Sequence, residues 1–258
     1  MPRYDLPHDL ERIYGPIGFA DRVLYSNFVS SLDGVVTLGS VASAGSIISG
    51  RNQADRFLMG LLRACADAVL LGAGTLRATP GHHWTPEHIY PSMAGTFADL
   101  RSSLRRQAEP RLVLFTSSGH VDVSHPAVVG GATIVTTRAG AANLKRHLPA
   151  SCDVVEVGEK GDVDVTAALE QLHARGFEVL LTEGGPHLVA DFIEAGVLDE
   201  AFLTLSPVIA GRDREARHGM VAGVELLPSR QIWSELTSAR RHGDFLFLRY
   251  DLRKRANP

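Results

Sequence analysis

The sequence predicts an α/β protein with a mostly parallel central sheet, helices on both faces and a C-terminal antiparallel hairpin. Two observations lead to this prediction. Short apolar runs alternate with amphipathic stretches along most of the chain, which is typical of parallel strands joined by helices. Near the C-terminus, His242-Gly243-Asp244 separates two strand-like runs, and a glycine in that position favours a hairpin.

Each element is expected from its local pattern. Residues 23–31 form the first apolar run, and 52–64 place apolar side chains on one face of a helix. The same reasoning predicts strands at 67–71, 111–116, 132–137, 153–157, 177–182, 200–206, 235–241 and 245–252. It predicts helices at 140–147, 165–175 and 186–195. Residues 211–232 have no clear period and are expected to form a long loop. We expect an N-terminal extension at 1–22 and a single domain at 23–258.

Composition excludes several classes of protein. The chain has 258 residues, 45% of them hydrophobic, which is enough to bury a full core. A formal net charge of −3 gives no general attraction to nucleic acid. Two cysteines outside any C-x-x-C motif exclude a disulfide scaffold, and no apolar run is long enough to span a membrane. The N-terminus lacks the apolar core of a signal peptide, so we expect a cytoplasmic protein.

A first glycine element, Gly72-Ala73-Gly74-Thr75, follows the predicted strand 67–71. It begins like a dinucleotide-binding G-x-G-x-x-G motif, but Arg77 occupies the third glycine position. Glycines at a strand end let a ligand approach the backbone, and Thr75 could donate to a phosphate. A tight turn that needs positive φ is an equally good interpretation.

A second glycine element, Glu183-Gly184-Gly185-Pro186, ends the predicted strand 177–182 and begins a helix. Proline suits the first turn of a helix because it has no N–H group to leave unpaired. The free N–H groups that follow would bind an anion such as pyrophosphate. Glu183 would repel that phosphate, so it would instead face a neutral or donor-bearing group such as a heterocycle. An ordinary acidic residue at a helix N-terminus is the alternative.

A third motif, Ser30-Ser31-Leu32-Asp33-Gly34, ends the first strand and is followed by a glycine-flanked segment at 45–50. Hydroxyls and a carboxylate at a strand end can line a ligand crevice, because open α/β sheets bind ligands there. A plain Asp-Gly turn is the alternative.

The three motifs, with LLRACADAVLLGAGT and LDEAFLTLSPVIAG, have the order and spacing of a known family. From about residue 23 to 250 the chain resembles the reductase domain of the riboflavin-biosynthesis deaminase-reductase. The resemblance implies a dihydrofolate-reductase-like fold, NADPH as cofactor and a homodimer. It also implies reduction of the ribosylamino group of a pyrimidine phosphate, as by 5-amino-6-(5-phosphoribosylamino)uracil reductase.

Site residues are carried over from the resemblance position by position. Those expected to contact the cofactor are Ser30, Ile47, Gly72, Gly74, Thr75, Gly184, Gly185, Pro186, His187, Leu188 and Val189. Those expected to face the substrate are Ser46, Arg63 and Glu183. Asp33 and Glu183 are the candidate catalytic residues, because hydride transfer to an imine-like carbon also needs a proton source.

The chain also departs from the family. The deaminase half is absent, because the sequence has no H-x-E and no P-C-x-x-C motif. Ala78-Thr79-Pro80 replaces an acidic pair before proline, and Gly81-His82-His83-Trp84 replaces a segment whose arginine helps hold the substrate phosphate. Reduction of another heterocycle such as a pterin therefore stays open, as does a non-catalytic NADP(H)-binding sensor.

Two further points concern ligands. His82, His83 and His88 lack the spacing of metal ligands, so we expect no metal; a lid that stacks Trp84 on a ring, or a plain surface loop, are the other interpretations. A preference for NADP over NAD requires hydroxyls or a cation at a strand end. Residues 116–118 and 137–138 both qualify.

Overall fold

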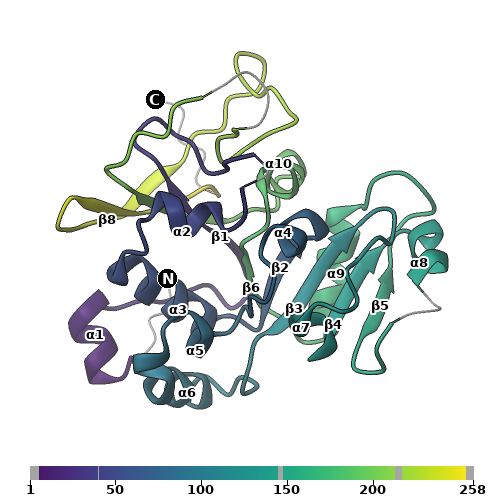
Figure 1. Ribbon diagram of the computed structural model, residues 1–258, viewed down its shortest axis with the longest axis horizontal. Coiled ribbons are helices and arrows are strands. Elements are labelled where there is room, and N and C mark those ends of the chain that lie inside the picture. The colour runs from purple at the N-terminus through teal and green to yellow at the C-terminus, as the bar shows by residue number, and fades with distance from the viewer. Residues whose placement is uncertain (1–5, 40, 145–147, 213–216, 254–258) are drawn as a thin grey trace. The chain divides into compact units, whose positions relative to one another are not determined.

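The computed structural model describes residues 6–39, 41–144, 148–212 and 217–253 (Figure 1). The chain divides into two compact units. The first consists of Met1–Val23 and Arg56–Leu181, and the second of Leu24–Asp55 and Thr182–Pro258. The expectation of a single domain over 23–258 stays a prediction.

The first unit contains a sheet with the strand order β5-β4-β3-β2-β6. The pairings of β2 with β3, β3 with β4 and β4 with β5 are parallel. Apolar side chains fill the central strands, so these strands are buried on both faces as parallel sheets require. The bounds are β2 (Ala68–Gly72), β3 (Arg111–Thr116), β4 (Ala132–Thr136), β5 (Asp153–Glu156) and β6 (Val179–Thr182), of which Thr182 begins the second unit.

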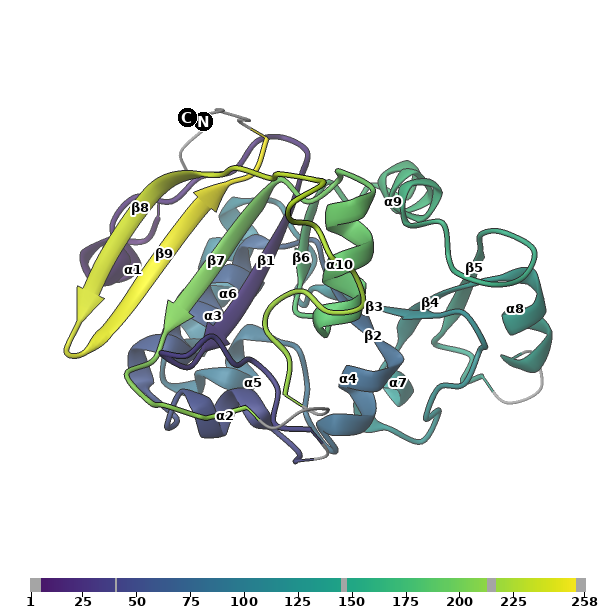
Figure 2. The same ribbon diagram turned by 90° about the horizontal axis from the view of Figure 1, so that it is seen from above.

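Helices cover both faces of this sheet. The chain steps outward from β2 to β5 through helices such as α7 (Pro126–Val129) and α8 (Arg138–Leu144), then returns to β6 through α9 (Val165–Ala174). Right-handed crossovers place the returning helix on the opposite face, and Figure 2 shows α9 across the sheet from α7 and α8. The other helices are α1 (His8–Tyr14), α3 (Gln53–Cys65), α4 (Ala73–Ala78), α5 (Pro86–Ile89), η1 (Pro91–Met93) and α6 (Ala94–Ser103).

The second unit contains the strand order β1-β7-β9-β8. Strands β1 (Val23–Ser30) and β7 (Glu200–Leu205) are parallel, whereas β9 (Phe245–Asp251) runs antiparallel to both β7 and β8 (Glu235–His242). The helices of this unit are α2 (Ala44–Ile48) and α10 (Pro186–Glu194). The parallel sheet and the C-terminal hairpin confirm the predicted fold class.

Most predicted elements are present within two residues of their expected bounds. The predicted helix 140–147 instead begins at Arg138, and its last three residues lie outside the described part of the chain. The short helices α1, α2, α4, α5, η1 and α7 and the longer α6 were not predicted. In α6 the buried face consists of Phe97, Leu100 and the charged Arg101, so hydropathy does not identify it. Residues 217–232 contain no helix or strand, as expected.

Candidate functional site

The second glycine element forms the N-terminal end of α10. Gly185 is the N-cap, with φ −69° and ψ 170°, and Pro186 is the first helical residue. No described side chain caps this end by a hydrogen bond, and the first turn carries no acidic residue. Because the first N–H groups of a helix have no partner within it, this end of α10 favours an anion.

Gly184 is required by a close approach between the chain and its own helix. A Cβ at this position would lie 2.8 Å from Leu188 Cδ2 and 3.2 Å from Thr182 Oγ1. The Gly184 N–H group donates to the same Thr182 Oγ1 over 3.2 Å. Glu183 is half-buried between these two residues, at the point where β6 ends.

Residues from the long loop contact the first turn of α10. The Ala222 N–H group donates to the Pro186 carbonyl oxygen over 3.3 Å. The rings of His187 and His218 lie 5.7 Å apart. A Cβ at Gly223 would lie 2.8 Å from His187 Nδ1. The sequence does not identify His218, because residues 211–232 have no period, although the glycines of this loop are typical of close contacts.

Asp33 holds the residues that follow β7. Its carboxylate accepts from Ser31 Oγ over 2.6 Å and from the N–H groups of Ala210 and Gly211 over 3.0 and 2.8 Å. Led by the Ser31 bond, these contacts lower the pKa of Asp33 to about 2. Gly34, with φ +81°, completes the Asp-Gly turn. Asp33 is therefore an anion near neutral pH, which suits it to ordering this loop and makes it a poor proton donor.

Ser30 and the α2 region meet at the ends of β1 and β7. The Ser206 N–H group donates to the Ser30 carbonyl over 2.8 Å, and Ser206 Oγ donates to the Ile48 carbonyl over 2.7 Å. Ile47 on α2 is 53% exposed, so its side chain is available to a ligand. Ser46, beside it, is half-buried.

Contacts within the second unit link three of its predicted site residues. Val36 donates to the His218 carbonyl over 2.9 Å, which connects the end of the Asp33 turn with the residue that contacts His187. Ser30, Asp33 and His187 are therefore joined by short chains of contacts within one unit.

The first glycine element lies in the first unit and is helical. Gly72 ends β2 and caps α4 with φ −83°, and Gly74 lies inside that helix. Neither residue has positive φ, so the tight-turn interpretation is wrong. A Cβ at Gly72 would meet nothing within 4 Å among the described atoms, and Thr75 is half-buried on α4. The backbone here is open to close approach, as the sequence suggested.

Arg63 and the histidine segment form a separate cluster in the first unit. The Arg63 side chain is fully buried, and its guanidinium donates to the carbonyls of His83 and Thr85, each over 3.3 Å. Trp84 is only 5% exposed and its ring lies 5.9 Å from that of His125, so it is packed rather than presented to a ligand. Among the described residues, no group of three or more His, Cys, Asp or Glu side chains could hold a metal.

The two strand ends considered for the NADP phosphate lie side by side. Thr137 Oγ1 donates to the Ser117 carbonyl over 2.9 Å, and Asn143 donates to the Ser118 carbonyl over 2.9 Å. Arg138 pairs with Glu159 over 3.2 Å at an exposed position. These bonds join the two segments and do not distinguish between them, so both 116–118 and 137–138 stay candidates for binding the 2′-phosphate of NADP.

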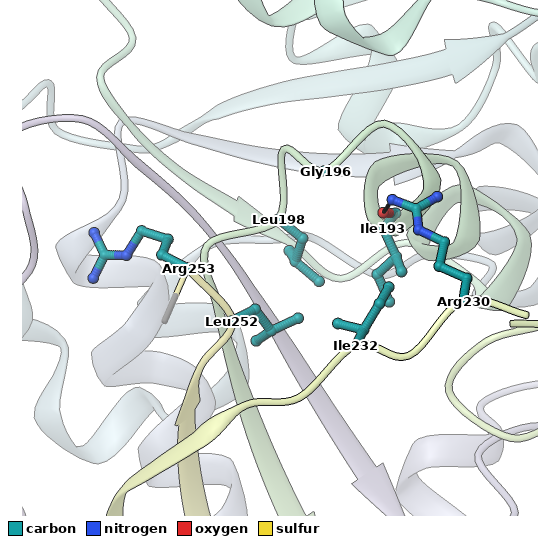
Figure 3. Close-up of a pocket in the computed structure, with 7 residues that line it drawn as sticks. All are labelled: Ile193, Gly196, Leu198, Arg230, Ile232, Leu252 and Arg253. Atoms are coloured by element: carbon teal, nitrogen blue, oxygen red, sulfur yellow. Dashed lines mark hydrogen bonds between the residues drawn. The ribbon is translucent and has the colours of Figure 1, made fainter. Parts of the chain in front are cut away.

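A pocket of about 260 Å³ lies in the second unit and contains none of the predicted site residues. In Figure 3 the side chains of Leu198, Ile232 and Leu252 point toward one another, whereas the Arg253 guanidinium points away. Arg230, at its rim, donates to the carbonyls of Glu194 and Ile193 over 2.8 and 3.2 Å. The pocket therefore borders the C-terminal end of α10.

Comparison with known proteins assigns the family. A family model, the RibD C-terminal domain, matches residues 22–232, which include every predicted site residue. The chain belongs to the RibD C-terminal domain family. This result confirms the resemblance seen in the sequence.

Individual relatives of this RibD-type chain are distant. It is 26% identical over 183 residues to the 2,5-diamino-6-ribosylamino-4(3H)-pyrimidinone 5′-phosphate reductase of Aquifex aeolicus, covering 70% of this chain and 75% of that protein. It is 26% identical over 196 residues to the protein of the same name from Archaeoglobus fulgidus, covering 74% and 83%. A crystal structure of a pyrimidine reductase-like protein from Corynebacterium diphtheriae is similar with a TM-score of 0.71 and 22% identity, covering 94% and 98%, and this similarity supports the fold.

Proposed function

We propose that the chain is an NADPH-dependent reductase of a ribosylamino-pyrimidine phosphate, resembling 5-amino-6-(5-phosphoribosylamino)uracil reductase of riboflavin biosynthesis. The observation that carries the proposal is the family match over 22–232. The relatives that carry reductase names support the same class of reaction, in agreement with the oxidoreductase expected from the sequence. A cytoplasmic location and a single reductase domain over 23–258 stay predictions.

The residues present fit a nicotinamide dinucleotide. The uncapped N-terminus of α10, without acidic residues in its first turn, suits a phosphate held by Gly184, Gly185 and the residues to Val189. In the first unit, a Cβ at Gly72 would meet no described atom within 4 Å, and the family resemblance implies a cofactor contact for Gly72, Gly74 and Thr75. The cofactor, when bound, supplies the hydride. The chain's own part is to orient the reactants and to supply or accept a proton.

Of the two candidate catalytic residues, Glu183 is favoured for the proton. The Asp33 carboxylate accepts three hydrogen bonds, from Ser31 and from the amides of Ala210 and Gly211, so it is engaged in holding the loop. Glu183 directly precedes the glycine element at a half-buried position. We therefore assign proton handling and substrate contact to Glu183, and the ordering of residues 208–212 to Asp33.

We also propose a homodimer formed through one face of the second unit's sheet. In the registers of β1, β7 and β9, Phe28, Leu203 and Leu248 share a row, and Ser30, Leu205 and Leu246 share the next. The apolar members of both rows are half-buried or exposed, Leu246 to 38%. On the opposite face, Glu200, Arg249 and Asp251 are buried. An apolar face left open while charges are buried is typical of a subunit interface.

The dimer is tested by sedimentation of the wild type and a Leu248→Glu variant. A dimer that becomes a monomer in the variant supports the proposal. A wild-type monomer at micromolar concentration would refute it.

The function is tested by absorbance at 340 nm with NADPH and the ribosylamino-pyrimidine phosphate, beside a fluorescence titration of NADPH alone. Substrate-dependent oxidation supports the proposal. Binding without turnover would instead favour another heterocycle, such as a pterin, or a sensor.

The Gly185→Asp variant should abolish NADPH binding, because it places a charge against the phosphate. Ala195→Asp places the same charge at the exposed C-terminal end of α10 and should bind normally. Equal affinities would contradict the assignment.

A further inference from the structure

Arg63 makes three hydrogen bonds to one short segment of the first unit. Besides the carbonyls of His83 and Thr85, its Nη2 lies 3.2 Å from His82 Nε2. An arginine side chain has only donors, so His82 Nε2 must accept this bond and the ring proton must lie on Nδ1. The guanidinium is fully buried, which makes these contacts costly to lose.

The same segment is joined to the helix of the first glycine element. Thr79 Oγ1 donates to the Thr75 carbonyl over 2.8 Å. His125 Nε2 lies 3.1 Å from the Thr79 carbonyl and therefore donates to it. The Trp84 ring lies 5.9 Å from the ring of His125 and 4.9 Å from that of His82. Contacts thus run continuously from Arg63 to Thr75.

We propose that Arg63 and His82 form a positioning pair that fixes the segment 79–85 against α4 and so sets the shape of the first glycine element. This assigns Arg63 a role through the backbone, in place of the substrate contact that the family resemblance implies. The link to NADPH rests on the proposed function, whereas the Arg63–His82 pair is inferred from the hydrogen-bond distances alone.

The electrostatic surroundings keep the pair in one protonation state. Burial lowers the pKa of His82 to about 3, with further lowering by Arg63 and Arg56 from α3 and by His83 and His88 from its own side. Burial also lowers the pKa of His88, which His83 and the two arginines lower further and Glu87 partly restores. His82 is therefore neutral throughout the physiological range, and its acceptor nitrogen stays available to Arg63.

The first experiment measures the ¹⁵N shifts of the His82 ring in wild type, Arg63→Met and Arg56→Met. The wild type should show a proton on Nδ1 and no titration above pH 5. Arg63→Met should raise the pKa of His82 and remove the tautomer preference. Arg56→Met removes a nearby charge but no bond to His82, so the tautomer should persist. A wild-type proton on Nε2 would overturn the proposal.

The second experiment follows Trp84 fluorescence and NADPH affinity in a Trp233→Phe background, where Trp84 is the only tryptophan. Arg63→Met should move the onset of pH-dependent quenching of Trp84 toward higher pH than in the wild type, because protonated imidazole quenches indole and the variant removes one of the charges that lower the pKa of His82. It should also weaken NADPH binding by about tenfold, the effect of one unmade buried hydrogen bond. Arg63→Lys should not restore affinity, because one ammonium cannot reach three acceptors in a plane.

The two proposals fail in distinguishable ways. If the wild type does not bind NADPH, the proposed function fails, while the tautomer measurement still decides the pair. If the wild type binds and Arg63→Met binds equally well, the positioning role is refuted and the proposed function stands.

Discussion

The carboxylate of Glu200 is fully buried and lies 2.6 Å from Arg249 Nη2, across the pairing of β7 with β9. Arg253 approaches the other carboxylate oxygen to 3.3 Å. Burial raises the pKa of Glu200 above its ordinary value, against the lowering by Arg249 and Arg253. The Arg249 guanidinium thus limits the cost of burying this charge.

Arg249→Met should destabilise the fold by about 3 kcal/mol near pH 8, because it leaves a buried carboxylate without its nearest partner. The pKa of Glu200 would rise further, and a raised folded-state pKa means stability is lost as the pH rises. The loss should therefore be smaller at pH 5 than at pH 8 in urea unfolding. Adding Glu200→Gln to the variant should recover part of the stability at pH 8. A loss that grows toward acid pH would contradict this account.

Arg101 closes the C-terminal end of α3. Its Nη1 donates to the carbonyls of Arg63, Ala64 and Ala66 over 3.1, 3.2 and 2.7 Å, at a side chain only 2% exposed. Arg101→Met should cost about 3 kcal/mol, since several buried acceptors lose a charged donor. Thermal unfolding of this variant beside Arg105→Met, an exposed arginine nearby, measures the difference. Equal unfolding temperatures would show that the buried donor contributes nothing.

Gly140 lies in α8, where this helix closely approaches the end of β4 and the loop that follows β3. A Cβ there would collide with Thr136 Oγ1 and lie 2.7 Å from the Ser117 carbonyl oxygen. Gly140→Ala should therefore destabilise the protein by about 2 kcal/mol. Gly95 lies on α6 with no atom within 4 Å of its would-be Cβ, so Gly95→Ala should stabilise by up to about 1 kcal/mol. The urea midpoint should fall in Gly140→Ala and rise in Gly95→Ala, relative to the wild type. An unchanged midpoint in Gly140→Ala would disprove the contact.

Asp33→Asn should speed hydrogen exchange at the amides of Ala210 and Gly211, because the carboxylate that accepts from both loses its charge. The pKa of Asp33 is lower in the folded state than in the unfolded state. The stabilisation by its carboxylate is therefore complete above the unfolded pKa near 4 and is lost as the pH falls toward 2. The protection of these two amides against exchange, relative to their intrinsic rates, should therefore stay constant in the wild type down to about pH 4 and fall as the pH drops toward 2. Unchanged exchange in the variant would refute the role.

The sequence predicted the strands well because burial on both faces leaves uninterrupted apolar runs such as 111–116. It predicted the second glycine element because proline and free helix amides are local features. It did not predict α4, since Gly74 and Thr75 are weak helix formers and the burial of Ala73 and Leu76 decides the outcome.

Contacts between distant segments explain the remaining differences. Arg63 meets carbonyls some twenty residues along the chain, and Asp33 meets amides far beyond it. Neither partner has a local sequence pattern. A backbone carbonyl or amide is present at almost every residue, so only the folded path of the chain determines which one a side chain reaches.

The segment 217–232 is attached at both ends of α10, through Ala222 to Pro186 and through Arg230 to Glu194. The nine residues of the helix span about 14 Å, whereas the eight steps from 222 to 230 could reach about 27 Å if extended. The segment between Ala222 and Arg230 is therefore longer than it needs to be to span α10. The segment can gain residues freely, but below about four steps it could no longer reach, so related sequences should vary in length there by insertion far more than by deletion.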